Sequence, residues 1–247
     1  GTRHEGGAAF MAEAVGKLTG SPAIAMGTRG VGSANLTIGI HTAYQDSTPM
    51  IAMVGHVETP YRHREALQEV ELAPFLGEIT KWSVEVPTGD RLPDLTNEAW
   101  RRSVSGRPGP VALALRGDIL DDEVPAELPV SSAVPVAAAD PEGVRQALEL
   151  LSRAERPLIV AGGGVSRAGA SDALVELAEA TGLPVMTAFR RHDAFPNDHS
   201  LFIGSLSLGA PAAVVARARD ADVVLAIGTR FGETTTFGYT IPGPGAT

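Results

Sequence analysis

A glutamate that follows an Arg-His pair stands at the start of a long apolar segment. Arg3-His4-Glu5 precedes residues 6–15, nearly all of which are small or apolar. A helix with so little polar surface should be buried in a core or in a subunit interface. Burial would raise the pKa of the Glu5 carboxyl group, whereas the helix N-terminus would lower it. Glu5 is therefore either an acid–base catalyst or a helix-start residue that favours the helix dipole.

A glycine-containing segment, residues 27–35, follows a predicted strand and opens a predicted helix. In that setting backbone N–H groups can bind an anion or approach a ligand closely. The spacing is nearly Gly-x-Gly-x-x-Gly, but Asn35 stands at the third glycine position. No Gly-Lys-Ser/Thr follows, which excludes a P-loop. A tight packing turn explains this segment as well as a ligand loop does.

Two further glycine segments, Gly162-Gly163-Gly164 and Gly228-Thr229-Arg230, also follow predicted strands. Ligands of open α/β sheets bind beyond the carboxyl ends of the strands, which is where these segments would lie. Turns that need glycine for their backbone conformation, with no ligand, account for them equally well.

The remaining residue types limit the chemistry. The chain has no cysteine, which excludes disulfides, thiolate metal sites and a cysteine nucleophile, and fits a cytoplasmic location. The histidines show no His-x-x-x-His spacing, so we expect no helical zinc site. His56 ends a predicted strand and either faces a pocket or makes structural hydrogen bonds. A net charge of -9 argues against a nucleic-acid partner. No uninterrupted apolar run reaches the ~18 residues of a membrane span.

Short apolar runs that alternate with helical patterns predict the elements that position these residues. They indicate an α/β protein with two layered domains, in which mainly parallel sheets are flanked by helices. Strands are expected at 23–26, 50–54, 83–86, 111–115, 158–161, 185–187 and 223–227, and helices at 32–44, 91–105, 140–154, 170–180 and 211–218.

A stretch rich in Pro, Ser, Asp and Glu divides the chain. We expect a first domain at 1–117, a linker at 118–135 and a second domain at 136–247. The acidic residues of the linker are interpreted as solvated rather than as a metal site. Asp140 is expected to cap the helix that follows.

Several motifs, in this order along the chain, resemble the thiamine diphosphate-dependent enzymes of the acetolactate synthase type. They cover residues 3–13, 28–35, 43–50 and 106–111 in the first domain and 181–186, 194–199 and 227–231 in the second.

The resemblance implies an enzyme that cleaves or forms carbon–carbon bonds of small 2-oxo acids. The glutamate matching Glu5 would hydrogen-bond the aminopyrimidine ring of thiamine diphosphate and promote the tautomer that removes the thiazolium C2 proton. Thr28, Gly30, Gly32 and Asn35 would lie near the pyrimidine or shape the turn there. A non-catalytic nucleotide-binding α/β module is the alternative.

Departures from the family pattern concern the substrate side. Acetolactate synthases usually carry Gln where this chain has His56, and Phe where it has Leu67 before Gln68. These positions face substrate or cofactor in relatives. In the second domain, Gly162 to Gly164, Thr229 and Arg230 match a region that holds FAD in some members. Other members have lost the flavin, so FAD stays open.

The family's motif for the diphosphate and Mg²⁺, Gly-Asp-Gly followed by Asn, does not occur in this sequence. We therefore expect the metal site to lie on a domain outside this chain, and this piece alone to bind the cofactor weakly and to be inactive. The sequence begins with Gly1 rather than Met, which indicates a part of a longer protein. Relatives pair the first domain with a neighbouring subunit, which implies a homodimer or homotetramer.

Overall fold

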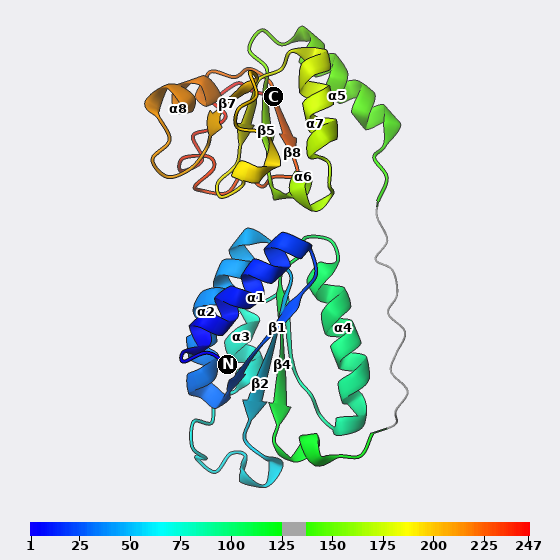
Figure 1. Ribbon diagram of the computed structural model, residues 1–247, viewed down its shortest axis with the longest axis vertical. Coiled ribbons are helices and arrows are strands. Elements are labelled where there is room, and N and C mark those ends of the chain that lie inside the picture. The colour runs from blue at the N-terminus through cyan, green and yellow to red at the C-terminus, as the bar shows by residue number, and fades with distance from the viewer. Residues whose placement is uncertain (125–136) are drawn as a thin grey trace. The chain divides into compact units, whose positions relative to one another are not determined.

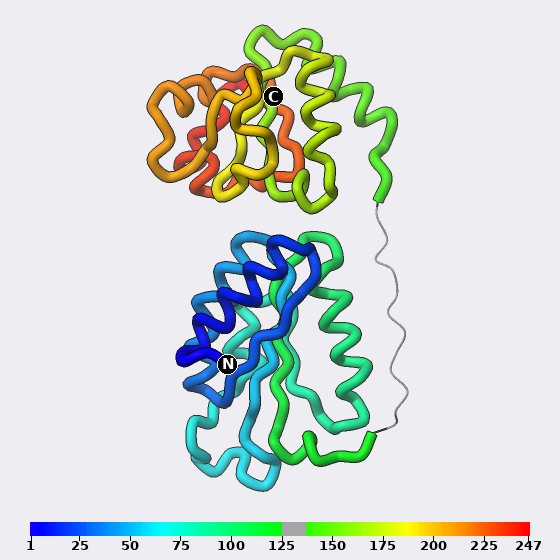
Figure 2. Tube along the Cα trace, in the orientation of Figure 1, coloured from blue at the N-terminus to red at the C-terminus, as the bar shows by residue number. Residues whose placement is uncertain are grey.

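The computed structural model describes residues 1–124 and 137–247. The chain divides into two compact units, Gly1–Val136 (unit 1) and Ala137–Thr247 (unit 2). Each contains a four-stranded sheet flanked by helices, and every strand pair is parallel (Figure 1). In unit 1 the chain trace alternates between helix and strand throughout (Figure 2). The predicted α/β fold class with parallel sheets is confirmed.

Unit 1 has the strand order β1-β2-β4-β3. Helices α1, α2 and α3 cover one face of this sheet and α4 covers the other. The elements are α1 (Glu5–Thr19), β1 (Ala23–Thr28), α2 (Arg29–Asp46), β2 (Met50–His56), α3 (Leu72–Gly77), β3 (Trp82–Glu85), α4 (Leu92–Val104) and β4 (Pro110–Arg116), with 3-10 turns at Thr59–Tyr61, Gly89–Arg91 and Asp118–Asp121.

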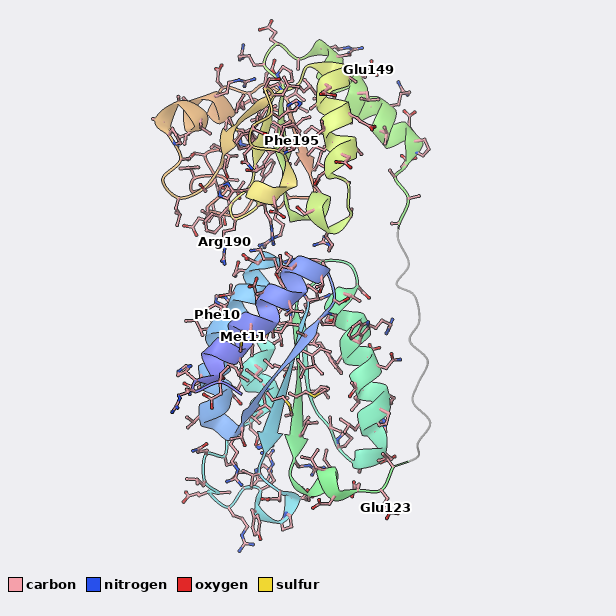
Figure 3. All side chains as sticks on the ribbon, in the orientation of Figure 1. Phe10, Met11, Glu123, Glu149, Arg190 and Phe195 are labelled. Carbon is pink, nitrogen blue, oxygen red and sulfur yellow. The ribbon has the colours of Figure 1, made fainter. Side chains whose placement is uncertain are left out.

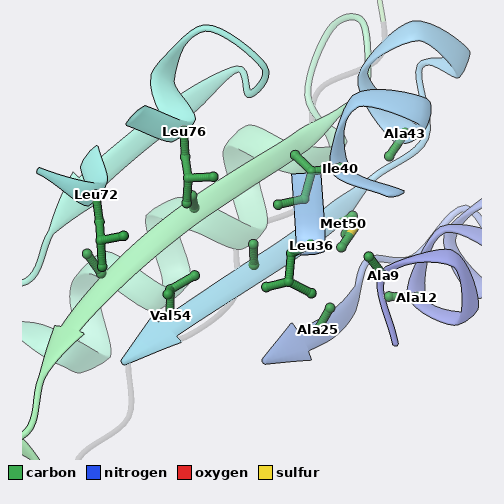
Figure 4. Packing of buried hydrophobic residues seen from close by; sticks show 13 residues of the cluster. Ala9, Ala12, Ala25, Leu36, Ile40, Ala43, Met50, Val54, Leu72 and Leu76 are labelled. Carbon is green, nitrogen blue, oxygen red and sulfur yellow. The ribbon is translucent and has the colours of Figure 1, made fainter. Parts of the chain in front are cut away.

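The core of unit 1 has two layers, one on each face of the sheet. Successive side chains of the strands alternate between these layers, as the period of two requires. Figure 4 shows the layer under α1, α2 and α3, which includes Leu36, Met50 and Val54. Ile51 and Leu113 point into the opposite layer, under α4. The central strands β2 and β4 are therefore buried on both faces, which explains why they read as continuous apolar runs, whereas the edge strand β1 has one exposed face.

Helix α1 is not buried within its unit. Gly6, Ala9, Ala12, Glu13 and Gly16 face the core, and these mostly small residues let α1 approach α2 and β1 closely. The outer side carries exposed apolar residues, which are Phe10, Met11, Val15 and Leu18 (Figure 3). Of the two alternatives, burial in the core is therefore wrong for the outer side of α1, whereas burial in a subunit interface stays a prediction.

Helix α2 begins earlier than the sequence predicted. Residues 29–31, which we placed before the helix expected at 32–44, form the first turn of α2, which runs from Arg29 to Asp46. Its glycines lower helix propensity but are tolerated here because other parts of the chain approach them closely. Within 1–124 and 137–247, no helix combines the length and the apolar character that crossing a bilayer requires.

Unit 2 has the strand order β7-β6-β5-β8. Helices α6 and α7 pack on one face, and α8 with the last residues of the chain packs on the other. The elements are α5 (Pro141–Arg153), β5 (Leu158–Ala161), α6 (Gly163–Arg167), α7 (Ser171–Thr181), β6 (Val185–Thr187), β7 (Phe202–Ser205), α8 (Ala212–Arg219) and β8 (Val224–Ile227), with a 3-10 turn at His192–Ala194.

The acidic end of unit 1 is more ordered than the predicted linker. Ile119 is buried, and Asp118 accepts a hydrogen bond from the Thr59 backbone N–H at 3.0 Å. Asp122 accepts one from the Gly89 N–H at 2.9 Å. These hydrogen bonds tie both carboxylates to unit 1, whereas Asp118 is half-buried and Asp122 is exposed to solvent, as the interpretation of the latter predicts. Most of the predicted linker, residues 125–135, lies outside the described residues.

Asp140 caps α5, as predicted. Its carboxylate accepts hydrogen bonds from the N–H groups of Gly143 at 3.0 Å and Glu142 at 3.4 Å. Asp140→Ala should destabilise the first turn of α5 by about 1 kcal/mol. We expect faster amide hydrogen exchange at Gly143 and no change in Asp140→Asn, because Asn caps equally well. Unchanged exchange in the alanine variant would contradict the capping role.

Candidate functional site

The predicted site residues of unit 1 gather where β1 and β2 end. The two strands are parallel, and Thr28 at the end of β1 pairs in register with Gly55, the residue before His56. Helix α2 starts directly after Thr28, so its first turn lies at this edge of the sheet. The carboxyl edge of a parallel sheet is the usual place for a ligand.

Glu5 contacts two of the predicted residues on α2. Its Oε2 accepts a hydrogen bond from Nδ2 of Asn35 at 2.9 Å. Its Oε1 lies beside Gly32, where a Cβ atom would come within 3.4 Å of that oxygen. His4 starts α1, because its Nδ1 accepts from the Gly6 N–H at 3.0 Å. The N-terminus of α1 thus presents the Glu5 carboxylate to the first two turns of α2.

The pKa of Glu5 is lowered from its ordinary value. The hydrogen bond from Asn35 is the largest cause, followed by a backbone hydrogen bond, and burial opposes them. The side chain is half-buried, so the expected shielding of Glu5 from water is not found in this chain. The lowering of the pKa thus prevails over desolvation, but its largest cause is the Asn35 amide and not the helix N-terminus that the sequence suggested. Glu5 is accordingly ionised near neutral pH.

Replacement of Asn35 tests this electrostatic arrangement. Asn35→Ala should raise the pKa of Glu5, since the largest lowering contribution is lost. The lowered pKa stabilises unit 1 above the pKa of the unfolded chain, and this stabilisation is lost as the pH falls through the folded value. Carboxyl ¹³C NMR titration measures the pKa of Glu5 in the folded protein. Thr37→Ala, on the exposed side of α2, should leave the Glu5 titration unchanged, and an equal shift in both variants would refute the assignment.

Gly30 allows a second segment of the chain to reach the start of α2. Its N–H donates to the carbonyl oxygen of Gln68 at 3.0 Å, and a Cβ atom at this position would lie 3.0 Å from that oxygen. Nη1 of Arg29 donates to the carbonyl oxygen of Leu67 at 3.1 Å. Leu67 and Gln68 therefore lie beside the start of α2, and the Leu67 side chain is 73% exposed.

His56 does not face an open pocket. Its side chain is fully buried, and its Nδ1 accepts a hydrogen bond from the Val57 N–H at 2.8 Å. Its Nε2 contacts the guanidinium of Arg62. Of the two interpretations that the sequence allowed, the structural hydrogen-bonding residue fits the geometry of unit 1, and the substrate-facing one does not.

The glycine segments of unit 2 pack against each other. A Cβ atom at Gly162 would lie 2.5 Å from Cα of Thr229, and one at Gly164 would lie 2.6 Å from Cα of Gly228. The N–H of Gly164 donates to the carbonyl oxygen of Gly228 at 2.8 Å. A Cβ atom at Gly163 would collide with Arg191. Close approach of the chain to itself therefore explains these glycines without a ligand.

Sequence reasoning missed several charged residues near this edge. Arg29 has a φ of 50°, which a residue other than glycine rarely adopts, and it anchors Leu67. Arg62 contacts His56 and three carboxylates. The sequence did offer one signal, which is the mixture of Arg and Glu in the segment after β2. Such a mixture is unusual next to a buried strand.

Comparison with known proteins identifies the family. The model for the thiamine pyrophosphate enzyme N-terminal TPP binding domain matches residues 1–74, and the model for the central domain of the same enzymes matches residues 144–245. The chain belongs to the thiamine pyrophosphate enzyme family. The two matches lie in units 1 and 2 in the expected order, and the resemblance inferred from the motifs is confirmed.

Relatives of this thiamine pyrophosphate enzyme chain include large subunits of acetolactate synthase. A probable large subunit from Methanocaldococcus jannaschii is 35% identical over 242 residues, covering 95% of this chain and 41% of the relative. A large subunit from Mycobacterium tuberculosis is 34% identical over 95% of this chain and 38% of its own length. Isozyme 3 from Escherichia coli is 32% identical over 95% and 42%. The chain thus spans about two fifths of the relatives that it matches.

Proposed function

We propose that this chain forms part of a thiamine diphosphate-dependent enzyme that cleaves or forms carbon–carbon bonds of small 2-oxo acids, with Glu5 as its acid–base residue. The Glu5–Asn35 pair beside Gly32 carries this proposal. It is supported by the family and by the names of the relatives, which are acetolactate synthases.

The residues around Glu5 fit a protonated nitrogen heterocycle. Asn35 donates a hydrogen bond to Oε2 of Glu5. Oε1 of Glu5 lies beside Gly32, which has no side chain to obstruct it. An ionised carboxylate accepts a hydrogen bond from a ring N–H strongly. Glu5, Gly32 and Asn35 would hold the aminopyrimidine, with Thr28 and Gly30 shaping the turn. Thiamine diphosphate, when bound, supplies the nucleophile and the electron sink.

The chain's own residues would then perform three tasks. Glu5 accepts the ring hydrogen bond and holds or releases a proton at its Oε1. Asn35 keeps the carboxylate oriented and ionised through its bond to Oε2. Leu67 offers an exposed apolar surface at the start of α2, which would exclude water from the substrate side.

The described residues do not form a site that fits Mg²⁺ or FAD. Within 1–124 and 137–247, no three His, Asp or Glu residues are grouped so that they could hold a metal ion. The glycines expected at a flavin site pack against Gly228, Thr229 and Arg191. Neither group therefore takes part in the tasks assigned to the residues of this chain. A flavin absorbance spectrum of the natural full-length protein decides whether FAD binds.

A homodimer or homotetramer in the cytoplasm belongs to the same proposal. The absence of cysteine fits a reducing compartment. The exposed apolar side of α1, formed by Phe10, Met11, Val15 and Leu18, supports pairing with another surface. Sedimentation equilibrium of the full-length protein measures the oligomeric state.

The proposed function is tested with the natural full-length protein, thiamine diphosphate, Mg²⁺ and a series of 2-oxo acids that begins with pyruvate. We expect consumption of at least one 2-oxo acid, with an aldehyde or a hydroxyketone as product, and dependence on thiamine diphosphate. Binding of a dinucleotide without consumption of any 2-oxo acid would support the non-catalytic module instead.

A further inference from the structure

Arg62 lies at the centre of a charge cluster that the proposed reaction does not use. Its side chain is 11% exposed, and its guanidinium lies 3.1 Å from Glu71, 3.4 Å from Glu85 and 3.6 Å from Glu69. Glu85 ends β3, whereas the other two carboxylates belong to the segment 57–71 between β2 and α3. One guanidinium therefore joins the end of a strand to that segment.

The same guanidinium lies against the ring of His56. Nη1 of Arg62 contacts Nε2 of the ring, and Nδ1 accepts the Val57 N–H at 2.8 Å. Because Nδ1 accepts this hydrogen bond, a second proton on the ring would have to displace it, and the charged ring is disfavoured. Burial, and then the charge of Arg62, lower the pKa of His56, whereas the three carboxylates of the cluster raise it.

Glu69 holds the segment in an unusual backbone conformation. Its carboxylate accepts hydrogen bonds from the N–H groups of His63 at 2.7 Å and Ala66 at 3.2 Å. His63, Glu65 and Gln68 have φ values of 60°, 56° and 60°. Residues other than glycine rarely adopt this left-handed conformation, and it persists only where the surroundings enforce it. The contact of Glu69 with Arg62 is part of those surroundings.

The far end of the segment is docked on the proposed site. The carbonyl oxygens of Leu67 and Gln68 accept hydrogen bonds from Arg29 and from the N–H of Gly30. Gly32, which lies against the Glu5 carboxylate, is two residues after Gly30 in the same turn of α2. A shift of the segment would therefore move the surface next to the Glu5 carboxylate.

We propose that Arg62 is a positioning residue that locks residues 62–69 and the ring of His56 into one arrangement. In this arrangement Leu67 and Gln68 are held on the start of α2. Without the guanidinium, Glu69 and Glu71 lose their arginine partner and Glu85 keeps only Arg116, 3.5 Å away, so that repulsion among the carboxylates loosens the segment. The consequence for catalysis rests on the proposed function, whereas the locking of the segment does not.

Arg62→Gln in the natural full-length protein tests the locking directly. Amide hydrogen exchange at His63 and Ala66 should become about tenfold faster, because the hydrogen bonds to a charged acceptor are weakened. NMR titration should show a higher pKa for His56, since the carboxylates then act without the opposing cation. Arg64→Gln is the matched control, because Arg64 is exposed and makes no ion pair within the described residues.

The catalytic part is tested by steady-state kinetics. We expect kcat/KM of Arg62→Gln to fall about ten- to a hundredfold, because Leu67 and Gln68 would no longer be held in position on the substrate side. Arg62→Lys should recover part of this loss, because an ammonium keeps the charge but lacks the planar fork of the guanidinium. If the wild-type protein consumes no 2-oxo acid, the proposed function fails, whereas exchange and titration still decide the role of Arg62.

Folding of unit 1 in the variants is followed by NMR at the indole N–H groups of Trp82 and Trp100, which lie in this unit. If Arg62→Gln does not fold, Glu85→Gln replaces it, and the pKa of His56 should then fall further. Wild-type exchange together with an unchanged His56 titration, in whichever variant folds, would overturn the proposal.

Discussion

Replacement of Glu5 by glutamine should lower the turnover of the natural full-length protein by about 10²- to 10⁴-fold, the usual contribution of a general acid–base group. Glutamine keeps the size of the side chain and an acceptor for Asn35, but it cannot hold or release a proton. The fold should be unaffected, because Glu5 is half-buried and its only described side-chain hydrogen bond within 1–124 and 137–247 comes from Asn35. Steady-state kinetics with the preferred 2-oxo acid measures the loss.

Glu13→Gln is the matched control on the same helix. Glu13 is buried, and its Oε1 accepts a hydrogen bond from Oγ1 of Thr48 at 3.3 Å, away from the start of α2. Glutamine retains that acceptor, so turnover should stay close to the wild-type value. Similar losses in both variants would mean that a general disturbance of α1, rather than proton transfer by Glu5, causes the effect.

Gly39→Ala should both destabilise unit 1 and separate Glu5 from Asn35. A Cβ atom at Gly39 would lie 2.8 Å from the carbonyl carbon of Ala9 and 2.9 Å from the backbone nitrogen of Phe10. Alanine favours a helix by about 1 kcal/mol over glycine, but overpacking against rigid backbone costs about 1–3 kcal/mol. The collision should therefore prevail and push α1 away from α2, with a loss of turnover.

Denaturant unfolding followed at the indole N–H groups of Trp82 and Trp100 measures the stability of unit 1, where both residues lie. Gly7→Ala is the control on α1, because the nearest atom to its Cβ would be 3.8 Å away, on Thr2. This variant should be more stable than wild type by up to about 1 kcal/mol. A Gly39→Ala protein at least as stable as wild type would show that the two helices are not in close contact there.

The strands were predictable because they form short apolar runs bounded by Gly or Pro, and β2, β4, β5 and β6 are also buried on both faces. All seven predicted strands are present, and their bounds differ by at most two residues. Strand β7 was missed, since it has four half-buried residues, includes Gly204 at a φ of 129° and pairs irregularly with β6. Helix α3 was missed because it has only six residues, with Pro74 among them.

The sequence predicted which residues form the site, but not their geometry. Glu5, Gly32 and Asn35, which the motifs selected, do lie together. Glu5 is partly exposed and Asn35 lowers its pKa because of the way α1 packs on α2. A local sequence pattern does not predict this packing. The contacts of Arg62 with His56 likewise join the end of a strand to a connection without regular spacing.

The exchange of the C2 proton of bound thiamine diphosphate in D₂O, followed by NMR, tests the role of Glu5 most directly. We expect the wild-type full-length protein to accelerate this exchange far beyond that of the free cofactor. Glu5→Gln, saturated with cofactor to the same extent, should lose at least about 10²-fold of that acceleration. Equal exchange rates in the two proteins would contradict the assignment of Glu5 as the residue that activates the cofactor.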